Sequence, residues 1–133
     1  MSNVFWRHNR RDIAMAIQAR CTEVFGVDIH PGASIGPGLM IDHGTGVVIG
    51  ETAVVGEDCS FLHGITLGAT GSSKEFDRHP KIGSNVFLGC GVTVLGNIKY
   101  VALHIRPNRH ACMHTYIPAH TCIHNTHTDF LLT

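Results

Sequence analysis

The sequence predicts a mainly β protein, a left-handed parallel β-helix of hexapeptide repeats that is preceded by one α-helix. Three observations support this fold. Apolar side chains recur at helical spacing before residue 26, an aliphatic residue recurs at nearly every sixth position from 29 to 99, and glycine often follows that residue. We divide the chain into a remnant N-terminal helix (1–26), the β-helix (27–99) with a projecting loop (68–81), and a tail (100–133).

Length and composition exclude several classes of protein. The 133 residues suffice for one domain, and ten basic residues balance ten acidic ones, which leaves no surface suited to nucleic acid or anionic membranes. No apolar run approaches the ~20 residues of a membrane helix, and the N-terminus lacks the apolar core of a signal peptide. A basic, amphipathic start also suits a transit peptide, but it fits better as a helix of the fold. We therefore expect a cytoplasmic protein.

The cysteines point to a reducing compartment. Their number is odd and no CxxC pair occurs, so disulfides are not expected. The sequence therefore predicts free, mostly buried thiols at Cys21, Cys59, Cys90, Cys112 and Cys122.

The segment from Asp12 to Phe25 is predicted to form the helix. Its apolar residues recur at helical spacing and would form one stripe. Asp12 would lie at the N-terminal end, where its carboxylate interacts favourably with the helix dipole, and Gly26 would end the helix at its C-terminus. The stripe consists of Ile13, Ile17, Cys21 and Val24.

From Ile29 the period becomes six, with a two-residue slip at Val47 and Val48. The aliphatic residue at the first position of each unit and the small residue at the fifth would point inward, and glycine at the second lets the chain turn. Three such units make a triangular coil, and coils stack about 4.8 Å apart. An ordinary sandwich of alternating strands is the other interpretation, but nine units nearly in register favour the β-helix.

Two segments leave this pattern. Residues 68–81 are rich in Gly, Ser and charge, so they must project as a loop, and loops on rigid scaffolds often have functions. After Lys99 the repeat stops, and six of the eleven histidines lie from His104 onward. We expect this tail to be poorly ordered and to come from another reading frame or a retained intron. Its Cys112, His114, Cys122, His124 and His127 are a candidate for a metal site, but their spacings match no standard zinc module, which favours an accident of low-complexity sequence.

Four motifs interrupt the repeat: VDIHP at 27–31, DHGTG at 42–46, GETA at 50–53 and DRHPKIG at 77–83. Together, across about residues 5–98, they closely resemble the serine O-acetyltransferase family, hexapeptide-repeat enzymes that make O-acetylserine for cysteine synthesis. GETA and DRHP distinguish this family from the sugar and xenobiotic acetyltransferases. The resemblance implies an acyltransferase with acetyl-CoA as co-substrate and no permanently bound cofactor.

Acetyl transfer from a thioester to serine needs a base for the hydroxyl proton and a group that orients the base. Neutral histidine suits the base because its pKa lies near the working pH, and a carboxylate can fix its tautomer. The resemblance assigns the base to His43 and its orienting partner to Asp28. A structural histidine, and an aspartate that merely caps the first coil, are the other interpretations.

The resemblance also implies the substrate contacts. Arg78 would clamp the carboxylate of L-serine with paired hydrogen bonds, Asp42 would attract the ammonium group, and His79 would complete the serine site. A solvated loop tip is the other interpretation of Arg78 and His79. Acetyl-CoA would be held by backbone groups of Gly68, Ala69, Cys90 and Gly91.

Two of the acetyl-CoA positions depart from the family pattern. Ala69 stands where a second glycine is usual, so its methyl group could crowd a close backbone approach. Cys90 stands where alanine is common.

A zinc enzyme is a rival interpretation. His63 holds the same unit position as His43 one coil later, so the two should stack, and with His79 they could bind zinc as in β-helical carbonic anhydrases. DHGTG and GETA favour the acetyltransferase, with no metal. His30, in an Ile-His-Pro corner, is expected to be structural.

The resemblance implies that family members carry a helical N-terminal domain, further coils over the rest of CoA, and a tail that docks into cysteine synthase. We expect this sequence to be truncated at both ends and to lack the docking tail, and we therefore expect weak or absent acetyl-CoA binding. An inactive, truncated or mis-spliced form that acts only as an oligomer subunit is the alternative. A homotrimer is expected either way, because the family's active sites lie between adjacent β-helices.

Overall fold

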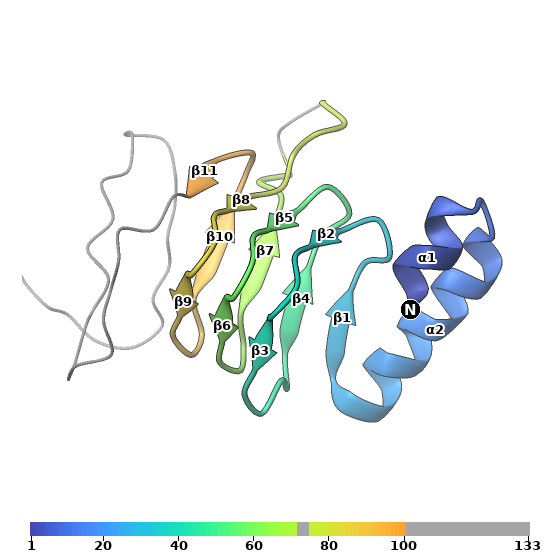
Figure 1. The fold of residues 1–133 in the computed structure, drawn as a ribbon, viewed down its shortest axis with the longest axis horizontal. Coiled ribbons are helices and arrows are strands. Elements are labelled where there is room, and N and C mark those ends of the chain that lie inside the picture. Colours follow the sequence, from blue (N-terminus) through green and yellow to red (C-terminus); the bar gives the residue numbers. More distant parts are fainter. Residues whose placement is uncertain (72–74, 101–133) are drawn as a thin grey trace, which may run out of the picture.

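The computed structural model describes residues 1–71 and 75–100, and the predictions for 101–133 lie outside the described residues. Two helices precede a stack of short strands (Figure 1). The helices are α1 (Ser2–Arg7) and α2 (Arg11–Phe25). The strands are β1 (Val27–Ile29), β2 (Ser34–Ile35), β3 (Met40–Ile41), β4 (Val47–Ile49), β5 (Val54–Val55), β6 (Ser60–Phe61), β7 (Thr66–Gly68), β8 (Lys81–Ile82), β9 (Phe87–Leu88), β10 (Thr93–Leu95) and β11 (Lys99–Tyr100).

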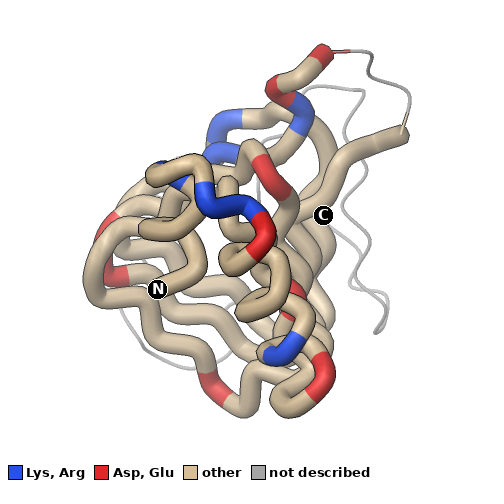
Figure 2. Tube along the Cα trace, turned by 90° about the vertical axis from the view of Figure 1, so that its right-hand side faces the viewer, with Lys and Arg blue, Asp and Glu red and all other residues tan. Residues whose placement is uncertain are grey.

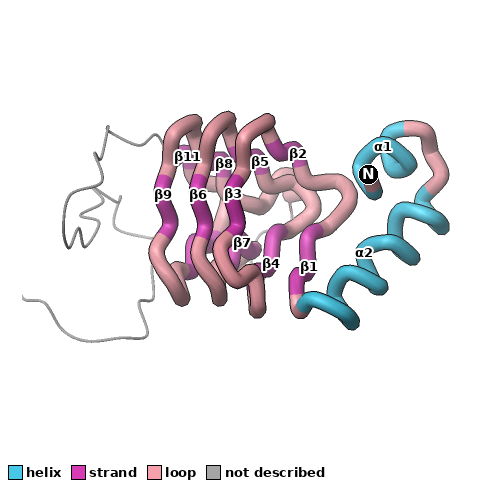
Figure 3. Tube along the Cα trace, turned by 60° about the horizontal axis from the view of Figure 1, so that its bottom comes forward, coloured by secondary structure: helices cyan, strands magenta, loops and turns pink. Residues whose placement is uncertain are grey.

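The strands form three parallel sheets, which are the faces of a triangular coil (Figure 3). Their orders are β1-β4-β7-β10, β2-β5-β8-β11 and β3-β6-β9, so each complete coil contributes one strand to each sheet. Every pair in these sheets is parallel, as stacked coils require. The predicted left-handed parallel β-helix is confirmed.

The register shows where the six-residue period is broken. Ile41 pairs with Phe61, twenty residues on, whereas Val48 pairs with Thr66, eighteen residues on. The two extra residues therefore lie in the turn at 42–46. The slip expected at Val47 and Val48 is wrong, because both residues pair regularly within β4.

The core follows the predicted inward positions. First-position residues of the repeats from β4 onward are almost fully buried, and Phe61 is the largest of them. Fifth-position residues such as Ala53 and Cys59 fill the space between them. Removing a side chain as large as that of Phe61 would cost about 3–5 kcal/mol of stability.

Two second-position glycines, Gly36 and Gly56, serve the stacking of the coils rather than the turning of the chain. A Cβ on Gly56 would lie 2.5 Å from the backbone nitrogen of Ser84 in the next coil, and one on Gly36 would lie 2.8 Å from the carbonyl carbon of Gly56. Neither glycine has a positive φ. The residue type is therefore set by the close approach of two backbones.

The predicted helix is confirmed as α2, and Gly26 ends it in the left-handed conformation with φ 66°. Ile13, Ile17 and Cys21 are half-buried, but Val24 is 49% exposed and does not belong to the buried stripe. Cys59 is a buried thiol, whereas Cys90 is exposed. Neither helix in the described part of the chain is long and apolar enough to cross a bilayer.

A short helix that the sequence analysis did not anticipate, α1, packs against the first coil. The Asn3 amide donates to the carbonyl oxygens of Pro31 and Ala33 at 2.7 and 3.0 Å. The Trp6 ring meets the edge of the His30 ring at a centroid distance of 4.9 Å. His30 Nδ1 in turn accepts from the Gly32 backbone at 3.0 Å, so His30 has the structural role expected of it.

The segment between β7 and β8 extends away from the coils (Figure 1). Its first and last expected residues, Gly68 and Lys81, belong to the two strands. Acidic and basic positions are interspersed along the trace, including this loop (Figure 2).

Candidate functional site

The DHGTG turn between β3 and β4 presents His43 to solvent. This turn holds the two residues that the period does not account for, and His43 adopts φ 63°, which is uncommon for a residue with a side chain. Its side chain is 74% exposed, and its Nε2 lies 3.7 Å from Asp42 Oδ2. Backbone strain of this kind gathers at functional sites. An accessible imidazole beside a carboxylate is suited to proton transfer.

Two further turns stack beneath this one along one edge of the coil (Figure 3). The rings of His43 and His63 meet edge to face at a centroid distance of 6.1 Å, so their predicted stacking is confirmed. The Gly91 N–H donates to the His63 carbonyl at 3.0 Å, which brings Cys90 and Gly91 to this same edge. We call this edge, formed by the β3–β4, β6–β7 and β9–β10 turns, the His43 corner.

Asp28, the predicted partner of His43, lies on β1 near this corner. The Gly46 N–H donates to the Gly26 carbonyl, two residues before Asp28. The hydrogen bond that Asp28 makes is with α2, because its Oδ1 accepts from the Gln18 side-chain amide. No bond between Asp28 and His43 is found among the described residues, so the orienting role stays a prediction.

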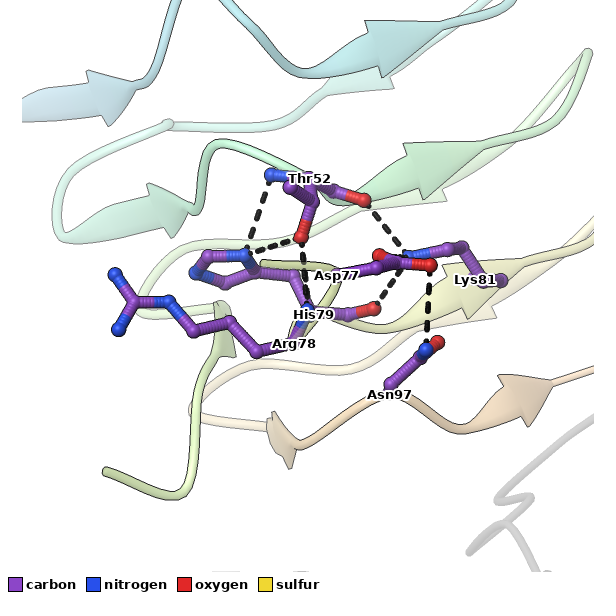
Figure 4. A network of polar contacts seen from close by, with 6 residues as sticks. All are labelled: Thr52, Asp77, Arg78, His79, Lys81 and Asn97. Atoms are coloured by element: carbon purple, nitrogen blue, oxygen red, sulfur yellow. Dashed lines mark hydrogen bonds and ion pairs between the residues drawn. The ribbon is translucent and has the colours of Figure 1, made fainter. Parts of the chain in front are cut away.

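The loop after β7 is bound to the β4–β5 turn through Thr52 (Figure 4). The backbone nitrogens of Arg78 and His79 donate to Thr52 Oγ1 at 3.1 and 3.2 Å. The His79 Nδ1 atom lies 2.7 Å from the same oxygen and 3.2 Å from the Thr52 backbone nitrogen. His79 is only 7% exposed. The loop is therefore fixed at the two residues predicted to bind serine.

Lys81 fixes the same loop from its other side. Its Nζ donates to the carbonyl oxygens of Thr52 and His79, both at 2.8 Å, and to Asp77 Oδ1 at 2.5 Å. Asn97 donates to Asp77 Oδ2 at 3.2 Å from the next coil. The hydrogen bond from Lys81 is the main reason that the pKa of Asp77 lies below its usual value. The guanidinium of Arg78 extends away from this network (Figure 4).

The imidazole of His79 lies directly over Gly50. A Cβ at Gly50 would overlap Cδ2 and Nε2 of the ring, so only glycine leaves space for it there. Burial lowers the pKa of His79, and the nearby positive charges of Arg78 and Lys81 lower it further. His79 is therefore held as a neutral ring near pH 7.

The predicted site residues fall at two corners of the coil. His43 and Asp42 precede β4, whereas Gly50 and the bound loop follow it, and a three-residue strand spans roughly 10 Å. Gly68 ends β7 and Ala69 follows it on the loop side, whereas Cys90 and Gly91 belong to the His43 corner. One chain therefore does not bring the predicted base together with Arg78 and His79.

This separation also bears on the zinc interpretation. His43 and His63 share one corner, but His79 lies over Gly50 at another and is bonded to Thr52. In residues 1–71 and 75–100, no three His, Cys, Asp or Glu side chains gather where they could hold a metal ion. The metal candidates of the tail lie outside the described residues.

The sequence analysis identifies the motifs GETA and DRHPKIG but assigns no role to Thr52, Lys81 or Gly50. The sequence separation of 27 positions between Thr52 and His79 hides their contact, because the contact depends on how the loop folds back. Only the joint presence of the two motifs could have pointed to it.

Comparisons with known proteins place this geometry in context. No family model matches the chain. It is 60% identical over 97 residues to probable serine acetyltransferase 4 of Oryza sativa subsp. japonica, covering 73% of this chain and 30% of that protein. It is 57% identical over 98 residues to serine acetyltransferase 1, chloroplastic, of Arabidopsis thaliana, covering 74% and 31%. The chain thus spans about a third of the length of these relatives.

Solved structures agree with the sequence comparison. The soybean serine acetyltransferase complexed with serine superposes with a TM-score of 0.71 at 55% identity, covering 74% of this chain and 40% of that one. The serine acetyltransferase from Brucella abortus strain S19 in complex with coenzyme A gives a TM-score of 0.71 at 50% identity, covering 74% and 39%.

Proposed function

We propose that this chain, which belongs to the serine acetyltransferases across 74% of its length, acts in acetyl transfer from acetyl-CoA to the hydroxyl of L-serine. The product would be O-acetylserine, the precursor for cysteine biosynthesis. The observation that carries this proposal is the 55% identity to the soybean enzyme complexed with serine, whose match covers 74% of this chain. Acetyl-CoA is the co-substrate, which the coenzyme A complex of the Brucella relative supports.

The chemistry we propose uses His43 as general base. Neutral His43 takes the proton from the serine hydroxyl as the oxygen attacks the thioester carbonyl, and the same proton then goes to the leaving CoA sulfur. The exposure of His43 supports this role, since the ring must reach a bound substrate. A base of this kind contributes about 10²–10⁴-fold to the rate. Asp28 would orient it, and the neighbouring Asp42 would attract the substrate ammonium.

Serine recognition is proposed for the loop that Thr52 and Lys81 hold. The Arg78 guanidinium extends away from the network around Thr52, a position that suits paired hydrogen bonds to the serine carboxylate (Figure 4). His79 would add a hydrogen bond from a ring that burial keeps neutral. Backbone groups of Gly68, Ala69, Cys90 and Gly91 would hold acetyl-CoA.

We further propose a homotrimer. The two corners of one chain keep His43 apart from Arg78 and His79, by roughly the length of strand β4. A threefold ring would set the His43 corner of one subunit beside the loop of the next. A cytoplasmic location is proposed as well, because free thiols at Cys21, Cys59 and Cys90 suit a reducing compartment.

Thiol release from acetyl-CoA in the presence of L-serine tests the activity. L-alanine is the matched control, since it keeps the carboxylate and the ammonium group but lacks the reacting hydroxyl. We expect release with serine alone. No release from a protein that still forms trimers would contradict the activity and favour the alternative, an oligomer subunit without catalysis.

A further inference from the structure

The hydroxyl group of Thr52 has its hydrogen-bonding capacity completely used. A threonine hydroxyl offers one donor and two acceptor lone pairs. The backbone nitrogens of Arg78 and His79 take the two lone pairs, at 3.1 and 3.2 Å. Two acceptors are then left for the single hydroxyl proton: His79 Nδ1, at 2.7 Å, and the carboxylate of Asp77, whose pKa is lowered in part by a hydrogen bond from the Thr52 side chain. The β4–β5 turn thus binds both the backbone and the ring of the same residue.

The backbone of Thr52 meets the same ring nitrogen as its hydroxyl group. A backbone N–H can only donate, and that of Thr52 points at His79 Nδ1 at 3.2 Å. Nδ1 must therefore be the acceptor, and a neutral imidazole then carries its proton on Nε2. Protonating Nδ1 would set two donors against each other.

The surroundings of the ring hold it in this state and in this place. Gly50 lies beneath the imidazole without a side chain, and the residue is 7% exposed. Burial lowers the pKa of His79, the charges of Arg78, Lys81 and His30 act in the same direction, and Glu51 opposes them. Nε2 faces away from Thr52, toward the side on which the Arg78 guanidinium lies (Figure 4).

We propose that Thr52 is a positioning residue that holds His79 as the Nε2–H tautomer, so that an uncharged ring donates a hydrogen bond to the carboxylate of bound serine. The serine part of this inference rests on the proposed function. The two residues would contribute differently: Arg78 supplies the charge that attracts the carboxylate, and His79 supplies a hydrogen-bond donor of fixed direction. A fixed donor loses little freedom when the ligand binds.

Ring-nitrogen NMR of the whole chain tests the tautomer without any substrate. The His79 signals are assigned among the eleven histidines by their loss in His79→Gln. We expect an unprotonated Nδ1 and a protonated Nε2 at pH 7 in the wild type and in Thr52→Ser, which keeps the hydroxyl. Thr52→Val removes the hydroxyl donor at 2.7 Å but keeps the backbone N–H at 3.2 Å, so the Nε2–H tautomer should stay the major form and a minor Nδ1–H form should appear. A wild-type Nδ1 that carries the proton, or a Thr52→Val ring unchanged from wild type, would overturn the proposal.

Calorimetric titration with L-serine tests the consequence. We expect Thr52→Val to weaken binding about tenfold, the loss of one well-placed hydrogen bond to a charged group, and Thr52→Ser to restore it. Thr93→Val is the matched control, since Thr93 makes no side-chain hydrogen bond within the described residues. Equal affinity in Thr52→Val and wild type would refute the positioning role. A wild type with the expected tautomer but no serine binding would refute the proposed function and leave the tautomer assignment standing.

Discussion

Two histidines, His43 and His79, lie at two corners of the β-helix in opposite environments, one exposed to solvent and one buried. His43 lies on a turn with a positive φ, and its side chain is 74% exposed. His79 lies on the loop after β7, is 7% exposed, and is bonded through both its backbone and its ring to Thr52. Both side chains are imidazoles, so the difference comes from the surroundings alone.

The contrast fits two different tasks. A base that takes a proton from a substrate must reach that substrate and change its charge, so a solvated ring is an advantage. A group that binds one fixed ligand atom gains from being immobile and from keeping one charge state. Under the proposed function each corner would provide half of a site, and the predictions below ask whether the two halves can be disturbed separately.

The largest expected difference comes from replacing each histidine by asparagine. His43→Asn should lower turnover by about 10²–10⁴-fold and leave the free energy of unfolding within about 0.5 kcal/mol, because asparagine tolerates a positive φ and the side chain is exposed. His79→Asn should destabilise the fold by about 1–3 kcal/mol, because the buried ring is lost and its half-buried partner Thr52 loses two hydrogen bonds. Thiol-release kinetics and urea denaturation measure the two effects.

His8→Gln, an exposed histidine at the end of α1, serves as the control for both. A large loss of stability in His43→Asn, or none in His79→Asn, would remove the contrast between the corners.

A smaller effect is expected from closing the space beneath the second ring. Gly50→Ala puts a methyl group where the His79 imidazole lies, so the ring must move and the loop with it. We expect stability to fall by about 1–3 kcal/mol and serine binding to weaken at least as much as in Thr52→Val. Melting temperature and calorimetric titration measure the change.

The matched control is Gly89→Ala, because a Cβ at Gly89 meets nothing within 4 Å among the described residues. If both variants behave alike, the ring is not held where the structure has it.

The sequence alone predicts the scaffold better than the contacts of the site. First- and fifth-position residues such as Phe61 and Cys59 reveal the coil because burial recurs every six residues. The two-residue slip shows the limit of this prediction. The repeat indicates that one coil is two residues longer than the others, but only the pairing of Val48 with Asp28 shows that the extra residues lie in the turn at 42–46 and not in β4. Short helix α1 lacks a periodic pattern of its own, and it is held by its contacts with the first coil.

The family motifs indicate which residues belong to the candidate site, but they do not indicate which hydrogen bonds hold those residues in place. Asp28 was matched with His43 by resemblance, but its bond to Gln18 follows from the way α2 packs beside β1. The anchoring of His79 by Thr52 depends on the path of an inserted loop, and hydrogen bonds across such a loop have no period in the sequence.

The smallest expected effect concerns the exposed end of the loop network. The pKa of Asp77 is lowered, chiefly by the hydrogen bond from Lys81, so the ionised form is favoured in the folded state. A carboxyl with a lowered folded pKa contributes stability that is complete above its ordinary value of 3.8 and is lost as the pH falls through the lowered value. Asp77→Asn should therefore be slightly less stable than wild type at pH 7, and the gap should close in acid.

Urea midpoints of wild type and Asp77→Asn, measured from pH 7 to pH 3, test this dependence. Glu57→Gln, another exposed acidic position, is the control and should give a pH profile parallel to that of wild type. A gap that stays constant down to pH 3 would mean that the Lys81 contact does not depend on the charge of Asp77. The loop would then be held by hydrogen bonds that do not depend on the charge of Asp77, namely those of Thr52 and those from Lys81 to the carbonyl oxygens of Thr52 and His79.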